Sequence, residues 1–139
     1  MLNIVLVEPE IPANTGNIGR TCVLTGSRLH LVRPLGFELT DRAVQRAGLA
    51  YWQSLNLQVH ESWAEFERTC LGGAYDHVHL LTKAGGRTHA EARYRDGDWL
   101  VFGKESSGLG RELLEAHPDR CERIPMLADN ALRNASAWH

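Results

Sequence analysis

The N-terminal stretch that decides the fold covers residues 2–25 and is LNIVLVEPEIPANTGNIGRTCVLT. Leu2–Val7 is a short apolar run rich in β-branched residues, which is typical of a buried strand. Proline cannot donate a ladder hydrogen bond, so Pro9 and Pro12 predict a loop over Glu8–Ala13. Asn14 is a favourable N-cap for a helix that runs to about Thr25, and Gly26 is a favourable end for it. The stretch therefore predicts a strand, a loop and a helix.

The rest of the chain repeats this alternation. Further strands are predicted over 28–33, 55–59, 77–82, 98–102 and 121–125, and further helices over 40–48, 62–70 and 109–116. Strands that alternate with helices predict an α/β fold with a mainly parallel sheet and helices on both faces. We expect residues 1–139 to form a single domain. Ligands of such sheets bind at the carboxyl ends of the strands, which points to the loops 8–20, 83–89, 103–110 and 126 onward.

Composition narrows the class of protein. The 139 residues carry 15 Lys and Arg against 17 Asp and Glu, a net charge of −2, which excludes a grossly basic nucleic-acid binder. The chain has neither an apolar run of the roughly 20 residues that span a membrane nor the basic start of a signal peptide. Cys22, Cys70 and Cys121 are widely spaced. We therefore expect a soluble, cytoplasmic protein with reduced cysteines.

Several familiar motifs fail on spacing. Gly103–Gly110 invites a phosphate-loop interpretation, but Glu105 stands where a Walker A loop needs a hydroxyl, and no strand is followed by the dinucleotide-binding glycine pattern. No nucleophile elbow of a hydrolase occurs. His77 and His79 share a strand face without a third ligand at suitable spacing, and His30 and His60 stand among the scattered histidines. The sequence therefore predicts no metal site.

Arg20 has two interpretations from position alone. It lies about two turns into the first predicted helix, on the same face as Asn17. A guanidinium there either extends to solvent on an apolar stem or meets an anion. Both interpretations stay open at this point.

Taken together, several segments resemble the bacterial tRNA (cytidine/uridine-34)-2′-O-methyltransferases of the SPOUT superfamily. The most specific segment is EPEIPANTGNIGR at residues 8–20. The resemblance extends over the chain to about Asp129 through residues 3–6, 31–37, 46–49, 81–83, 102–105, 108–109 and 124–126.

This resemblance implies a C-terminal trefoil knot, S-adenosyl-L-methionine as cofactor, a tRNA anticodon stem-loop as substrate and a homodimer. It implies methyl transfer to the 2′-oxygen of the wobble ribose at nucleotide 34. By matching positions, it assigns Arg20 to activation of the ribose hydroxyl and matches Glu105 to the acidic residue of the family's second motif. We expect Asn14 and Glu105 to be organising residues of the catalytic site. The matched cofactor-binding residues are Leu81, Gly103, Ile124 and Ser136.

The resemblance weakens after Met126. The family continues with a Ser-x-Asn-Leu-Ser-Asn segment and a long helix, whereas residues 128–139 read ADNALRNASAWH. Asn134-Ala135-Ser136 is the nearest counterpart of Asn-Leu-Ser. We expect a truncated or frameshifted C-terminus and an incomplete knot. The alternative hypothesis is therefore a catalytically inactive relative that retains only RNA or nucleotide binding.

Overall fold

The computed structural model describes residues 1–39, 42, 46, 52–82, 87–88 and 94–123. Within that part, no helix has both the length and the apolar character needed to cross a bilayer. The helix predicted over 40–48 lies almost wholly outside the described residues, so that prediction stays untested.

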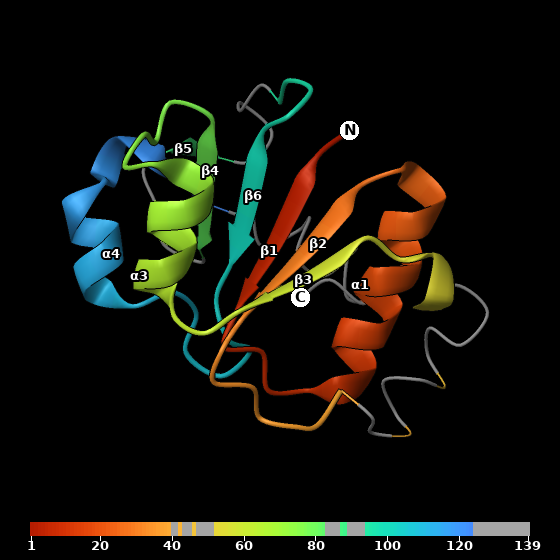
Figure 1. Cartoon of the computed structure of the whole chain (residues 1–139). Helices are drawn as coiled ribbons and strands as arrows, with labels where there is room; N and C mark the ends of the chain where they lie inside the picture. Colours follow the sequence, from red (N-terminus) through yellow and green to blue (C-terminus); the bar gives the residue numbers. More distant parts are fainter. Residues whose placement is uncertain (40–41, 43–45, 47–51, 83–86, 89–93, 124–139) are drawn as a thin grey trace.

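A parallel sheet forms the centre of the molecule (Figure 1). Its strands lie in the order β3-β2-β1-β6-β4-β7-β5, and each pair of neighbours is parallel. Their bounds are β1 Asn3–Val7, β2 Arg28–Val32, β3 Leu57–His60, β4 Val78–Thr82, β5 Arg87–Thr88, β6 Trp99–Phe102 and β7 Cys121–Arg123. This confirms the predicted mainly parallel α/β fold, although the two-residue β5 was not predicted.

Helix α1 spans Pro12–Thr25, so it begins two residues before the predicted cap. Its N-cap is Ile11, which has no side-chain cap, and Asn14 lies inside the first turn. The prediction of Asn14 as the cap is therefore wrong. Proline fits the first turn of a helix because its fixed φ is helical and the N–H it lacks would have no partner there. The predicted end is confirmed, since Gly26 adopts a left-handed φ of 72°.

A second helical segment begins at Ser62 as predicted, because its hydroxyl accepts a hydrogen bond from the Glu65 N–H at 3.1 Å. Helix α3 covers Trp63–Phe66 and continues as a π-helical turn, η2, over Glu67–Leu71. Gly72 ends it with a φ of 60°. The other helices in the described part of the chain are short: η1 Trp52–Ser54, α4 Arg111–Ala116 and η4 Pro118–Arg120.

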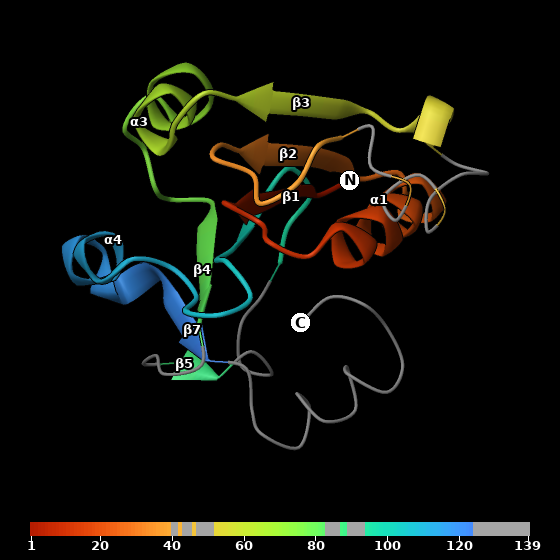
Figure 2. The same ribbon diagram turned by 90° about the horizontal axis from the view of Figure 1, so that it is seen from below.

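Two apolar clusters hold helices on the two faces of the sheet. On one face Cys22 and Ile18 of α1 pack on Leu29 and Leu31 of β2. On the other, α3, η2 and α4 pack around Phe66 in a cluster that includes Val5, Val32, Leu80 and Val101. Both views show α1 and α3 on different sides of the strands (Figures 1 and 2). A fully buried aromatic or aliphatic side chain contributes about 1.5–3 kcal/mol to such a cluster.

Candidate active site

The strand order creates a switch point between β1 and β6. After β1 the chain crosses to β2 on one side, while β6 continues to β7 on the other. Ligands of open parallel sheets bind outside the carboxyl ends of the strands at such a point. The loops that follow β1 and β6 meet there, and both were predicted as candidate loops.

A carboxylate clasp joins the two loops. The Glu105 carboxylate accepts hydrogen bonds from the backbone N–H groups of Glu10, at 2.7 Å, and Ile11, at 3.0 Å. In return, the Glu10 carboxylate accepts one from the Ser106 N–H at 2.9 Å. Hydrogen bonds from the backbone and side chain of Ser106 lower the pKa of Glu10. We use the name clasp for Glu10, Ile11, Glu105 and Ser106.

The clasp supplies the side-chain hydrogen bond that is missing at the N-cap of α1. The first N–H groups of a helix have no partner within it, and negative charge near them is favourable. Because Ile11 caps without a side-chain hydrogen bond, the carboxylate of Glu105 supplies this function from a residue more than ninety positions away. Glu105 therefore fixes the start of α1 relative to the loop after β6.

The turn after β1 is conformationally strained. Glu8 has a φ of 53°, which few non-glycine residues adopt. Its N–H donates to the Val32 carbonyl at 2.9 Å, and its carboxylate lies 3.4 Å from the ammonium of Lys104. Strain of this kind persists where surrounding contacts enforce it, often at functional sites.

Gly103 permits the tight path of the second loop. A Cβ at this position would lie 2.0 Å from the carbonyl carbon of Gly108 and 2.1 Å from the Leu109 nitrogen. The loop then closes through a hydrogen bond from the Gly108 N–H to the Lys104 carbonyl at 2.7 Å. Only glycine fits position 103 without a shift of the backbone, which brings the main chain of this loop to the carboxyl end of β6.

Leu81 lies beside this glycine. It is 3% exposed and pairs in register with Phe102, the residue before Gly103. Because Leu80 packs in the cluster under α3, the alternation of a strand directs Leu81 to the opposite face. The structure thus brings two predicted cofactor-binding residues together. Ile124 and Ser136 lie outside the described residues.

Arg20 and Asn14 are both on α1. Asn14 is half-buried in the first turn, next to the clasp in sequence, whereas Arg20 is exposed. Arg20 is nine residues beyond Ile11, which places it about 14 Å along the helix axis at 1.5 Å per residue. The structure therefore does not bring Arg20 into contact with Glu105.

A model of the SpoU rRNA Methylase family matches residues 1–137 of the chain. The chain belongs to this family. The tRNA (cytidine(34)-2′-O)-methyltransferase of Methylovorus glucosotrophus (strain SIP3-4) is 45% identical over 137 residues, which cover 98% of this chain and 87% of that protein.

Solved structures agree with this membership. One, described as structural insights into the 2-OH methylation of C/U34 on tRNA, has a TM-score of 0.83 at 45% identity and covers 91% of this chain and 80% of its own. An AdoMet-bound rRNA methyltransferase from Sinorhizobium meliloti shares the fold, with a TM-score of 0.76 at 22% identity over 90% of this chain and 47% of that one. The resemblance described from the sequence is confirmed at the level of the SpoU family.

Two buried polar clusters of this SpoU family member were not predicted. The first joins His79 of β4 to Asp98, through Nε2 at 2.8 Å, and to Glu122 of β7, through Nδ1. The Tyr94 hydroxyl also donates to Glu122 at 2.9 Å. Burial disfavours the charged imidazole, but hydrogen bonds and charge from Glu122 and Asp98 outweigh it and raise the pKa of His79. We call this group the buried network.

The second cluster joins two histidines of neighbouring strands. His30 Nδ1 of β2 lies 3.0 Å from His60 Nε2 of β3, and the two rings stack at a centroid distance of 5.2 Å. From the sequence we predicted that these two histidines are scattered, and that prediction is wrong. Burial lowers the pKa of His30 to about 4, with help from the nearby charges of His60 and Arg28. Both histidines lie on apolar strands, and only the order of the strands brings them together.

Proposed function

We propose that this SpoU family member transfers a methyl group from S-adenosyl-L-methionine to the 2′-oxygen of the ribose at nucleotide 34 of tRNA. The observation that carries this proposal is the 45% identity to a tRNA (cytidine(34)-2′-O)-methyltransferase over nearly the whole chain, together with the clasp at the switch point. The alternative, a relative that binds RNA without transfer, has no such support in the described residues.

The residues at the switch point fit the proposed cofactor. Leu81 offers a buried apolar side chain, and Gly103 brings main-chain polar groups to the same strand ends. Among the described residues of the two loops, the carboxylates of Glu8, Glu10 and Glu105 outnumber the ammonium of Lys104, and an excess of negative charge favours a cationic sulfonium. We propose Leu81, Gly103, Ile124 and Ser136 as the cofactor-binding residues. S-adenosyl-L-methionine supplies an electrophilic methyl group on a sulfonium that leaves as a neutral thioether.

Arg20 is proposed as the residue that activates the ribose. A 2′-hydroxyl is a weak nucleophile, so a cation that stabilises negative charge on its oxygen lowers the barrier to attack. Long helical side chains point back toward the N-terminus of their helix. For α1 this direction leads toward the clasp, so the guanidinium of Arg20 is directed from an exposed position to the edge where the ribose must approach.

Asn14 and Glu105 complete the proposed site. Glu105 acts through α1, whose start it fixes, and is therefore a positioning residue. Asn14 lies two residues beyond Pro12, on the first turn of the same helix. Alignment of this kind contributes to catalysis because small displacements of reacting groups reduce rates strongly.

The assembly is part of the same proposal. We propose one SPOUT-type domain over residues 1–139, a trefoil knot in its C-terminal part, a homodimer and a cytoplasmic protein with no metal requirement for methyl transfer. Residues 124–139, in which the knot is proposed, lie outside the described part of the chain.

A pair of synthetic anticodon stem-loops tests the function. One carries a ribose at nucleotide 34, and the other differs only by a 2′-deoxyribose there. With methyl-labelled S-adenosyl-L-methionine, we expect label in the first RNA and at most background in the second. Equal labelling of both would place the acceptor atom elsewhere. Tight binding of the first RNA without any labelling would favour the inactive relative.

A further inference from the structure

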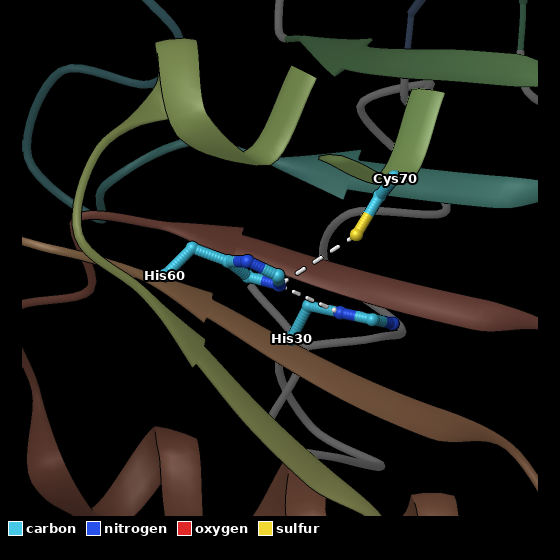
Figure 3. Close-up of side chains that lie close together, drawn as sticks. All are labelled: His30, His60 and Cys70. Carbon is cyan, nitrogen blue, oxygen red and sulfur yellow. Dashed lines mark hydrogen bonds between the residues drawn. The ribbon is translucent and has the colours of Figure 1, made fainter. Parts of the chain in front are cut away.

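His30, His60 and Cys70 converge between the sheet and η2, on the face opposite α1 (Figure 3). One potential ligand atom from each lies within 4.8 Å of the others. His60 Nε2 is at the centre, 3.0 Å from His30 Nδ1 and 4.0 Å from the Cys70 sulfur. We propose that these three side chains form a binding site for a borderline-soft divalent cation, with Zn²⁺ as its natural ligand.

The spacing is close to that of a tetrahedral zinc site. Bonds of about 2.05 Å to nitrogen and 2.3 Å to sulfur give edges of roughly 3.3 Å between nitrogens and 3.6 Å between nitrogen and sulfur. His60 Nε2 is 3.0 Å from His30 Nδ1 and 4.0 Å from the Cys70 sulfur, so both separations reach these values with shifts of less than about half an ångström. The three ligand atoms all lie within 4.8 Å of one another. Three protein ligands leave the fourth position to water.

A carboxylate also lies beside the central ligand, His60. The other ring nitrogen of His60, Nδ1, lies 3.7 Å from the Glu65 carboxylate. Zinc-bound histidines usually direct their second nitrogen to a carboxylate, which fixes the ring and leaves the first nitrogen free to coordinate. With Nδ1 of His60 toward Glu65, the lone pair on Nε2 faces His30 and Cys70.

The position of Cys70 in its helical segment is a further feature of this cluster. Cys70 lies on a π-helical turn, a rare geometry that recurs at functional sites.

Binding of the ion has a defined proton balance. The thiol of Cys70 releases its proton to solvent and bonds as a thiolate. His60 coordinates through Nε2. His30 coordinates through Nδ1 as the tautomer with its proton on Nε2. The ion thereby links β2, β3 and η2, and it stabilises the edge of the sheet that β3 forms.

Co²⁺ is a suitable probe because it takes the same ligands as Zn²⁺ and absorbs light. We expect one Co²⁺ per chain, with thiolate-to-cobalt charge-transfer absorption that Zn²⁺ abolishes by displacement. C70S loses this absorption, whereas C121S, which alters a buried cysteine on β7, retains it. Cys70 is only half-buried, so C70S keeps its fold, and circular dichroism verifies this.

Two further measurements extend the test. We expect E65Q to weaken Co²⁺ binding by about 10- to 100-fold, because the carboxylate of Glu65 orients the ring of His60. Zn²⁺ raises the thermal midpoint of the native chain but not that of C70S, because only a ligand bound to the folded state stabilises it. A folded native chain without charge-transfer absorption, or absorption that persists in C70S, overturns the proposal. No step of this test uses methyl transfer, so its outcome is independent of the proposed function.

Discussion

The clasp and the buried network both hold distant parts of the chain together through carboxylates, yet they do so in opposite surroundings. The clasp is exposed, and its carboxylates accept hydrogen bonds from main-chain N–H groups. In the buried network, Asp98 and Glu122 have side chains only 4% and 5% exposed and bind a histidine that is 11% exposed.

This difference gives the two groups different roles: the clasp positions α1, whereas the buried network matters for the stability of the fold. Water competes for an exposed carboxylate, so each hydrogen bond of the clasp contributes little to the free energy of unfolding. Its value lies in the geometry it imposes on α1. A buried charge that loses its partner has no such replacement, so removal of one member of the network lowers the free energy of unfolding far more than removal of one member of the clasp.

The largest expected effect comes from breaking the buried network. H79L leaves two buried carboxylates without their shared imidazole, and we expect the free energy of unfolding to fall by about 3–5 kcal/mol. Chemical denaturation measures this. His77 serves as the control, because its side chain is 65% exposed and lies 3.3 Å from Asp98. H77L changes stability by less than about 1 kcal/mol, and an equal loss in both variants would contradict the comparison.

For G103A we expect a smaller but still measurable loss of unfolding free energy. The added Cβ would lie 2.0 Å from the Gly108 backbone, so the loop after β6 must shift. We expect a loss of about 1–3 kcal/mol in unfolding free energy, together with weaker binding of S-adenosyl-L-methionine by calorimetry. The matched control is G110A, where nothing lies within 4 Å of the added atom. A G103A chain indistinguishable from G110A would exclude the tight path as a requirement.

For the clasp itself, E105Q replaces one carboxylate oxygen by an amide that cannot accept a backbone N–H. We expect the free energy of unfolding to fall by about 1 kcal/mol, which is the typical contribution of a helix cap. The amides of Glu10 and Ile11 then exchange their hydrogen faster, which hydrogen-exchange mass spectrometry detects. E115Q on the exposed face of α4 is the control and shifts stability by less than about 0.5 kcal/mol. Unchanged exchange in E105Q would separate Glu105 from the start of α1.

The smallest effect is a pH dependence of the buried network. The pKa of His79 is raised in the folded state, so its charge stabilises the fold fully below the unfolded pKa of about 6.5. That contribution to stability is lost as the pH rises through the folded pKa of His79 and the imidazole loses its positive charge beside Asp98 and Glu122. Denaturation between pH 6.5 and pH 8.5 should show falling stability for the native chain and a flatter profile for H79Q. A profile of equal slope in both chains would assign the dependence to other groups.

Much of the framework was predictable because it depends on local signals. Apolar runs predicted the long strands. Gly26 predicted the end of α1, and Ser62 predicted the start of α3. The rule that ligands bind at the carboxyl ends of parallel strands pointed to the loops of the clasp. The N-cap of α1 was missed by three residues, because Pro12 and the distant Glu105 together replace the cap that Asn14 offered.

The polar contacts were not predictable from spacing. His30 and His60 are 30 residues apart, and His79 and Glu122 are 43 apart. Each pair meets only because β2 lies beside β3 and β4 beside β7, an order that strand patterns do not specify. The same holds for the backbone partners of Glu105. The resemblance marked this residue as important, but only the fold shows that it binds the two N–H groups before α1.

The central claim, that α1 presents Arg20 to the reacting ribose, is tested most directly by the kinetics of R20A. Loss of a charge that stabilises the transition state should lower the rate of methyl transfer to an anticodon stem-loop by about 10²-fold or more. The affinity for S-adenosyl-L-methionine should stay within a few-fold. R28A, which removes another exposed arginine, should retain most of the rate. Native turnover by R20A would contradict the claim.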